Sequence, residues 1–369
     1  MRIGIDCRLW STTTGRHIRE NVKQLAKIDR SNEYVLFFLP EDLHKFDGPD
    51  NFKKVEVNIH WHTLEEQLKM PFILLKQNLD LVHIPYYNVP VFYPKKFVVT
   101  IHDLTILKVN TGRASTRPKL FYKFKKLGFR IAIWFAAYRS KKIFTVSEFV
   151  KQDIVKYFNV NKDKIVVTYN GAAESLFKPA SSEEISEALD EYSIKEPYLF
   201  YVGNAHPHKN VESLIKAFGK VIEGQPNLNL VIGGKKDYFV KRLIKEFKDK
   251  PYFNKIIFTG FIDDKYLPAV YSGAEAFVFP SFSEGFGLMI LEAFSCGTKV
   301  ICSNVTSLPE IGGDAAYYFN PEDTDDMAES IIKALGDNSE EKTKLGFERA
   351  KKFTWEDSAK KILDTYNSL

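Results

Sequence analysis

Cysteine is scarce in this sequence: Cys7, Cys296 and Cys302 are the three among 369 residues. Their spacing matches no zinc or iron–sulfur ligand pattern, so we predict no metal site. Isolated thiols of this kind are typical of a protein that stays in a reducing cytoplasm. The sequence therefore disfavours a disulfide-built secreted domain and a metal-centred enzyme.

Long apolar runs are also missing. No stretch approaches the roughly 18 apolar residues that a membrane-spanning helix needs, and Asp6 stands where an export signal would have its apolar centre. Hydrophobic residues make up 44% of the chain and charged residues 27%, which predicts a soluble globular protein. A chain of this length is expected to form two domains of about 180 residues each.

Acidic residues are absent between Asp103 and Glu148, where arginine, lysine and aromatic residues accumulate, mainly over 113–142. One interpretation is a helix on an anionic membrane face. Another is a core helix with inward rings and solvated lysines. Nucleic-acid binding is a third, although no motif of that kind accompanies the charge. The expected location is therefore the cytoplasm, with the inner face of the cell membrane as a candidate surface.

The most informative stretch runs from Ala276 to Cys302. Its residues predict a buried strand over Ala276–Phe279, a glycine-containing loop to Gly287, and a helix over Leu288–Ser295. Free N–H groups at such a helix start form an anion site, at the strand edge where α/β proteins bind ligands. Glu284 in the loop and Glu292 on the helix would frame it, although each could equally be an ordinary solvated carboxylate.

Short β-branched and aromatic runs alternate with helical patterns along the rest of the chain, which is typical of doubly wound α/β domains. Expected strands include Arg2–Asp6, Tyr34–Leu39, Val55–Ile59, Leu81–Pro85, Phe97–Ile101, Lys142–Val146, Ile165–Thr168, Tyr198–Val202, Leu228–Ile232 and Ile256–Thr259. We predict a first domain over 1–180, a Ser/Glu-rich linker over 181–196, and a second domain over 197–354, followed by an amphipathic helix over about 355–369.

Polar or flexible residues follow several of these strands. Gly15 lies at the first strand-to-helix turn, His102 and Asp103 follow Phe97–Ile101, and Lys209 follows Tyr198–Val202. Such positions deliver functional groups to a ligand, and a lysine there can neutralise a diphosphate. Each residue also has a plain structural interpretation, as a turn glycine, a buried histidine, a helix cap or a surface lysine.

Taken together, the segments Glu284-Gly-Phe-Gly-Leu-(x)3-Glu292, TIHDL and GNAHPHKN resemble the retaining glycosyltransferases of family 4. The resemblance covers nearly the whole chain. It implies the GT-B fold: two Rossmann-like domains facing a central cleft, with the C-terminal helix crossing back to the first domain. It also implies transfer of a sugar from a nucleotide-diphosphate donor with retained anomeric configuration and no metal.

By the same resemblance, His102, Glu284 and Lys209 would act at the reacting centre, with Asp103 as an acceptor contact. Donor-binding positions would be Gly15, Asn204, Lys209, Phe261, Ile262, Glu284, Gly285, Phe286, Gly287, Leu288 and Glu292. The family usually has an arginine where Asn204 stands, so one positive charge is missing. Either His208 or Arg16 would compensate, or the leaving group would be stabilised mainly by Lys209 and backbone amides. The loop Thr12–Gly15 is also less glycine-rich than in the family.

The resemblance favours mannosyl- and rhamnosyltransferases of bacterial surface polysaccharides, and therefore GDP-mannose as the donor. UDP-glucose and UDP-N-acetylglucosamine are alternatives. The acceptor would be a saccharide or a lipid-linked saccharide, and no cofactor beyond the donor is expected. A sugar-nucleotide epimerase of the same fold is a rival, as is a non-catalytic protein that binds a membrane or nucleic acid. A dehydrogenase is disfavoured because no G-x-G-x-x-G follows either domain's first strand.

Overall fold

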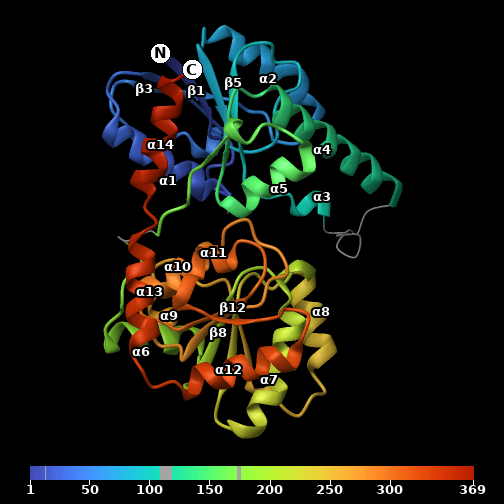
Figure 1. Ribbon diagram of the computed structural model, residues 1–369, viewed down its shortest axis with the longest axis vertical. Coiled ribbons are helices and arrows are strands. Elements are labelled where there is room, and N and C mark those ends of the chain that lie inside the picture. Colours follow the sequence, from blue (N-terminus) through green and yellow to red (C-terminus); the bar gives the residue numbers. More distant parts are fainter. Residues whose placement is uncertain (13, 109–118, 173–175) are drawn as a thin grey trace. The chain divides into compact units, whose positions relative to one another are not determined.

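A computed structural model describes residues 1–12, 14–108, 119–172 and 176–369. The chain divides into two compact units (Figure 1). The first unit comprises Met1–Asn170 and Thr354–Leu369, and the second comprises Gly171–Phe353. Each unit has its own parallel sheet, so each is described by itself.

The predicted linker 181–196 lies within the second unit, as do the described residues of 171–180. Ser182–Tyr192 form helix α6, which opens with a capping box between Ser181 and Glu184. The serine and glutamate residues that suggested a solvated linker are those that begin this helix, because each satisfies the other's backbone N–H. Ala188 and Leu189 are buried on its inner side.

The first unit is built on a seven-stranded parallel sheet with the order β3-β2-β1-β4-β5-β6-β7. Its strands are β1 (Arg2–Asp6), β2 (Glu33–Phe38), β3 (Phe52–Glu56), β4 (Leu81–Ile84), β5 (Phe97–Ile101), β6 (Ile143–Thr145) and β7 (Ile165–Val167). Its helices are α1 (Gly15–Ile28), α2 (Leu64–Lys76), α3 (Thr105–Lys108), α4 (Lys119–Arg139), α5 (Glu148–Phe158) and α14 (Trp355–Asn367), with short 3-10 turns over Pro40–Asp42 and Lys162–Lys164.

Helix α14 belongs to the first unit, as the resemblance implied. It lies beside α1 (Figure 1), and its inner residues Ala359, Ile362 and Tyr366 share a core with β1 and β2. The Tyr366 hydroxyl lies 2.5 Å from Nδ1 of His83 on β4. The last helix therefore completes the core on one face of the first sheet.

The second unit has a six-stranded parallel sheet with the order β10-β9-β8-β11-β12-β13. Its strands are β8 (Tyr198–Val202), β9 (Asn229–Gly233), β10 (Ile256–Gly260), β11 (Ala276–Phe279), β12 (Val300–Ser303) and β13 (Tyr317–Phe319). Its helices are α6, α7 (Val211–Gly224), α8 (Tyr238–Phe247), α9 (Leu267–Ser272), α10 (Leu288–Ser295), α11 (Leu308–Gly312), α12 (Thr324–Gly336) and α13 (Glu341–Lys351), with 3-10 turns over Pro207–Lys209, Phe253–Lys255 and Gly313–Ala315.

Most expected strands are present within a residue or two, and the prediction of doubly wound parallel sheets is confirmed. The prediction for Val55–Ile59 was wrong in its bounds, because β3 spans Phe52–Glu56. This strand lies at the sheet edge, where most of its side chains are solvated and leave no apolar pattern. Within the described residues, no helix is both long and apolar enough to span a bilayer.

Candidate functional site

Lys209 and Glu284 meet at the carboxyl edge of the second sheet. Lys209 ends the turn after β8, Glu284 lies in the loop after β11, and these two strands are neighbours. The crossovers from β8 and β11 leave toward opposite sides, so this is the switch point where a doubly wound sheet opens a ligand crevice. The Lys209 Nζ lies 2.7 Å from Glu284 Oε1, with the two side chains 13% and 11% exposed. A nearly buried ion pair therefore stands where ligands bind in this class of fold.

The loop that carries Glu284 leads directly into helix α10. Gly287 is the N-cap of α10 and has a φ of 97°, and a Cβ there would lie 2.7 Å from Leu308 Cδ2. Only glycine adopts this conformation without strain. The Ser307 hydroxyl donates to the carbonyl oxygens of Glu284 and Phe286, both at 3.0 Å. Gly285 and Gly287 thus lie in a braced loop that leads to Leu288, the first residue of α10. The Phe286 ring is buried against Phe353.

Glu292 lies on α10 and is only 3% exposed. The interpretation as a solvated surface glutamate was therefore wrong. Its Oε2 accepts a 3.0 Å hydrogen bond from the Tyr271 hydroxyl of α9. A buried carboxylate needs such donors, because burial without them is costly. The hydrogen bond from Tyr271 therefore fixes the orientation of the Glu292 carboxylate.

Asn204 lies in the loop after β8 and is exposed. Its Oδ1 accepts a hydrogen bond from the His206 N–H, and its carbonyl oxygen accepts one from the Tyr201 hydroxyl. Burial, followed by the Glu284 charge, raises the pKa of Tyr201, so Tyr201 stays a neutral donor. Asn204 thus shapes the turn that carries Lys209.

The end of β10 presents Phe261 and Ile262. The Phe261 ring is 61% exposed, whereas Ile262 is buried beneath the sheet edge. Sequence reasoning missed Lys236, which follows β9 and lies close enough that a Cβ on Gly260 would be 3.7 Å from its Cε. A lysine two residues after Gly233-Gly234 was the available signal. Lys236 brings a further exposed cation to the same edge of the sheet.

In the first unit, the switch point lies between β1 and β4. Gly15 begins α1 just after β1, and a Cβ on it would lie 2.1 Å from the Leu9 carbonyl oxygen, which excludes any side chain. Its N–H donates to Thr12 Oγ1 at 3.0 Å. The predicted loop is therefore closed internally by a threonine, in place of the glycines expected from the family.

His102 follows β5 at the same edge. Its Nε2 lies 3.0 Å from the Pro85 carbonyl oxygen. A carbonyl can only accept, so Nε2 carries the proton and Nδ1 is left as an acceptor. Burial lowers the pKa of His102, although the Pro85 carbonyl and Asp103 oppose the shift. The ring is thus a neutral, oriented imidazole.

His17 is a second histidine at this edge, and sequence reasoning missed it. Its ring lies 4.7 Å from that of His102, edge to face, and its Nδ1 is 2.8 Å from Asn170 Oδ1. Burial and the neighbouring His102 lower the pKa of His17. Its place two residues after Gly15, in the first turn of α1, was the only sequence signal. Asp103 caps α3, with Oδ1 accepting from the Thr105 N–H at 2.7 Å. Its contact with an acceptor stays a prediction.

The basic aromatic segment 113–142 is described only in part. Residues 113–118 lie outside the described residues, and side chains are described from Leu127 on. That part of α4 exposes Leu127, Ile131, Trp134 and Tyr138. On the neighbouring helix α2, Leu64, Leu68 and Phe72 are also exposed. The core-helix interpretation holds for Ile133, Ala136 and Ala137 but leaves this apolar stripe unexplained.

Two family models match the chain. The one described as Glycosyltransferase Family 4 matches residues 14–175, and the one described as Glycosyl transferases group 1 matches residues 181–353. Between them they span both units.

Individual proteins are similar over most or all of the chain. The chain is 30% identical to "O-antigen chain mannosyltransferase B" of Escherichia coli, covering 97% of this chain and 96% of that protein. It is 30% identical to "O-antigen chain mannosyltransferase RfbU" of Salmonella typhimurium, over 71% and 67% of the two chains. Among solved structures, Anabaena Alr3699/HepE, in complex with UDP and glucose, matches with a TM-score of 0.79 at 16% identity over all of both chains.

Proposed function

Because this chain belongs to the family 4 glycosyltransferases and has their GT-B fold, we propose that it transfers mannose from GDP-mannose to a saccharide. The acceptor would be a growing surface polysaccharide or its lipid-linked precursor. Two relatives that match over most of their length are named as O-antigen chain mannosyltransferases, which supports this donor and this product.

The observation that carries the proposal is the Lys209–Glu284 pair at the switch point of the second sheet. In the free protein the lysine neutralises the carboxylate at 2.7 Å. A donor would bring a diphosphate for the lysine and sugar hydroxyls for the carboxylate, so each partner of the pair gains a ligand group. The N–H groups around Gly285 and Gly287, with the start of α10, would hold the same diphosphate.

The remaining donor contacts follow from the same edge. Glu292 would accept the ribose hydroxyls while Tyr271 holds it in place. Phe261 and Ile262 would flank the base, mostly through backbone groups. Lys236 or His208 would provide the charge that Asn204 lacks, and Gly15 would be a further donor contact. Arg16, one residue further, is the other candidate for the missing charge.

In this mechanism the bond between the anomeric carbon and the diphosphate oxygen breaks as the acceptor oxygen bonds to the same face, so configuration is retained. The departing diphosphate oxygen takes the acceptor proton. Lys209 and the α10 N-terminus stabilise the negative charge of the leaving group. His102 would accept a hydrogen bond from the transferred sugar through Nδ1, with Asp103 toward the acceptor. No metal is needed in this scheme, so a chelator should leave turnover unchanged.

The apolar stripe on α2 and α4 supports a further proposal, contact with an anionic membrane at the inner leaflet. Arg130 and Arg139 on α4 are exposed beside the stripe, which suits rings at the interface and cations at head groups. Co-sedimentation with vesicles of phosphatidylglycerol or phosphatidylcholine tests it. Equal recovery with both, unaffected by salt, would exclude electrostatic docking.

The test of the main proposal has two stages. Thermal shift against GDP-mannose, GDP, UDP-glucose, UDP-N-acetylglucosamine, UDP and NAD identifies the nucleotide, because a ligand of the folded state raises Tm. Transfer of labelled mannose to oligomannosides, with the product anomer read by NMR, then tests the reaction. A rise in Tm with uridine nucleotides alone would mean that the donor is a UDP-sugar. Formation of an isomeric sugar nucleotide, with no glycoside product, would indicate an epimerase.

A further inference from the structure

A buried histidine lies behind the imidazole at the reacting edge of the first unit. His17 is 5% exposed, whereas the ring that it contacts, His102, is half-buried. The two rings meet edge to face, at a centroid distance of 4.7 Å and an interplanar angle of 86°. His17 therefore contacts the His102 ring from within the protein, away from the side that a substrate would approach.

The His102 ring needs more than its hydrogen bond to be held in one plane. The bond from Nε2 to the Pro85 carbonyl oxygen is 3.0 Å long and fixes one atom of the ring. Such a bond leaves the ring free to turn about the N–H direction, because acceptor geometry at a carbonyl is broad. The perpendicular His17 ring opposes this turn, since edge-to-face contact is favourable for aromatic rings. The direction of the Nδ1 lone pair of His102 thus depends on the place of His17.

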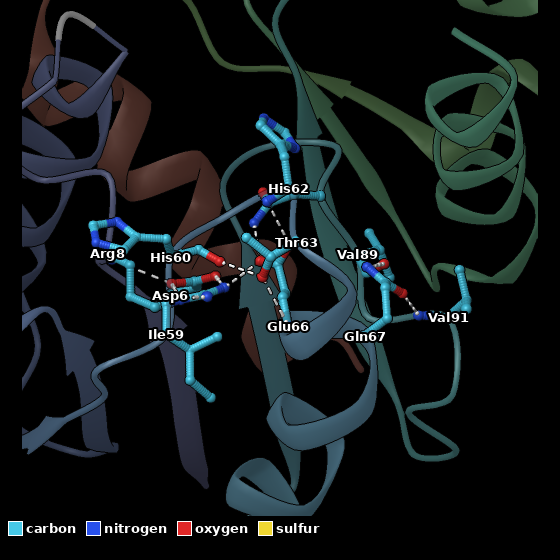
Figure 2. Close-up of polar contacts among 11 residues, drawn as sticks. Asp6, Arg8, Ile59, His60, His62, Thr63, Glu66, Gln67, Val89 and Val91 are labelled. Atoms are coloured by element: carbon cyan, nitrogen blue, oxygen red, sulfur yellow. Dashed lines mark hydrogen bonds and ion pairs between the residues drawn. The ribbon is translucent and has the colours of Figure 1, made fainter. Parts of the chain in front are cut away.

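The backbone of His17 is held by the loop that precedes α1. Arg8 in this loop donates to Asp6 and Glu66, each at 2.6 Å, and to the Ile59 carbonyl oxygen at 3.0 Å (Figure 2). Arg8 is 1% exposed, and breaking such a buried pair is strongly unfavourable. Because this network fixes the start of α1, the orientation of the His17 ring is left to its side-chain contacts.

Asn170 fixes the His17 ring itself. Its Oδ1 lies 2.8 Å from His17 Nδ1, and because an amide oxygen only accepts, Nδ1 carries the proton. The Asn21 Nδ2, which is a donor, lies 3.4 Å from both ring nitrogens, and Nε2 is the one with a lone pair to accept. The contacts of both nitrogens therefore suit a neutral imidazole with one defined tautomer.

A positive charge on His17 would be unfavourable in this setting. Burial lowers the pKa of His17 most, and His102 lowers it further, while the bond to Asn170 opposes the shift. The titratable groups around the two rings are His83 on β4, Tyr86 after β4, His102 and Asp103 after β5, and Tyr366 on α14. At neutral pH the His17 ring is therefore uncharged.

His17 also contacts both segments by which the chain leaves and re-enters the first unit. That unit ends at Asn170 and resumes at Thr354. Asn170 bonds to the His17 ring, and the Trp355 ring lies 5.9 Å from it. A displacement of either segment would reach the His17 ring directly and the His102 ring through it.

Resting on the proposed transfer of mannose, we infer that His17 is a positioning residue for this reaction. It sets the plane of the His102 ring, and Asn170 sets the tautomer and the orientation of His17. The same contacts tie the reacting edge to the segment by which the chain leaves the first unit. An uncharged His17 also keeps a second cation away from the positive charge that develops on the transferred sugar.

Two substitutions of His17 separate the ring from its hydrogen bond. His17→Ala removes both, and His17→Phe keeps a ring beside His102. We expect His17→Ala to lower kcat for mannose transfer about 10- to 100-fold, since misplacing a reacting group by about 1 Å has effects of this size. His17→Phe should regain part of that loss. KM for GDP-mannose and the affinity for GDP, measured by calorimetry, should stay as in the natural chain.

His83 provides the matched control. It is as buried as His17 and lies in the same unit, but its ring contacts Phe144 and Tyr366. His83→Gln should therefore keep the kcat of the natural chain. Melting temperatures identify any variant that fails to fold. If His17→Ala is among them, Asn170→Ala carries the test, because the Asn170 side chain is only partly buried.

Asn170→Asp gives a readout that a purely structural role would not change. The aspartate accepts the same Nδ1–H, but its charge favours the imidazolium and so raises the pKa of His17. We expect kcat of this variant to fall over the pH range in which the ring carbon signal of His17 titrates by NMR. Asn170→Ala should show no such pH dependence. A kcat that stays constant while His17 takes up its proton would overturn the requirement for a neutral ring.

Unchanged kcat in folded His17→Ala would refute the positioning role, and a loss that lies in KM for GDP-mannose alone would overturn it in favour of a donor contact. If the natural chain transfers mannose from no donor, the proposed function fails, but the ring signals of His102 still report the contact. A change of these signals in both His17→Phe and Asn170→Ala would support His17 as the group that orients His102, and identical signals would exclude it.

Discussion

The Lys209–Glu284 pair makes a prediction that separates stability from donor binding. Lys209→Ala leaves Glu284 without its 2.7 Å partner in a setting where only 11% of its side chain is exposed. An uncompensated, largely buried carboxylate should destabilise the free protein by about 2–3 kcal/mol. Adding Glu284→Gln removes the charge, so the double variant should recover part of that loss.

Donor binding should behave differently, because the lysine is the group that would contact the diphosphate. Loss of a charge-assisted hydrogen bond worth about 1.5–3 kcal/mol weakens affinity by about 10- to 100-fold. The double variant should stay as weak as Lys209→Ala, even where its stability recovers. Urea denaturation gives the first quantity, and calorimetric titration with GDP gives the second.

Two outcomes would refute this reasoning. If GDP binds Lys209→Ala as tightly as it binds the natural chain, the lysine makes no contact with the diphosphate. If Glu284→Gln restores affinity together with stability, the lysine acts only by supporting the loop. Lys216, which pairs with Glu212 on the exposed surface of α7, provides the matched control: Lys216→Ala should change the free energy of unfolding by less than about 1 kcal/mol.

Three further predictions concern other parts of the chain. Gly287→Ala places a Cβ on a residue with a φ of 97°, at 2.7 Å from the Leu308 side chain. We expect the free energy of unfolding, measured by urea denaturation, to fall by at least about 2 kcal/mol, and GDP to bind more weakly. Glu292→Gln keeps a hydrogen-bond acceptor for Tyr271, so Tm should change little while the affinity for GDP falls. If the variant and the natural chain bind GDP equally well, Glu292 does not contact the donor. Burial, and then the charge of His102, lowers the pKa of His83 to about 3. Because the histidine of the unfolded chain takes up a proton near pH 6.5, the stability is full above that pH and falls below it, by about 2 kcal/mol at pH 5. The free energy of unfolding of His83→Gln should therefore depend less steeply on pH between 5 and 7 than that of the natural chain.

The sequence predicted the sheets well where strands are buried on both faces. Strands such as Phe97–Ile101 and Ala276–Phe279 are continuous apolar runs, and their bounds agree with the structure. The bounds of β3 were predicted wrongly and β13 was not predicted, for different reasons. The first is an edge strand with solvated side chains, and the second, Tyr317–Phe319, is too short to leave a pattern. Helix α6 was assigned to the linker because capping residues and linker residues have the same composition.

The candidate site could be predicted as far as it depends on strand ends. Lys209 and Glu284 each follow a strand, and the order of strands then brings them together. The burial of single side chains could not be predicted from the sequence, because Glu292 is enclosed only once the chain has folded. His17 likewise contacts His102 only because α1 and β5 converge. The groove beside Asn88 could not be foreseen either, since residues of three separate segments line it.

The position of α14 has a consequence for how the protein is made. A ribosome releases the first unit's sheet long before it reaches Trp355–Asn367, because the whole of Gly171–Phe353 is translated in between. Until then the core that receives Ile362 and Tyr366 stays open. The unit that is synthesised first should therefore mature last, after the inserted unit has folded. Nascent chains arrested before residue 354 should show a protease-resistant second unit and a still cleavable first one.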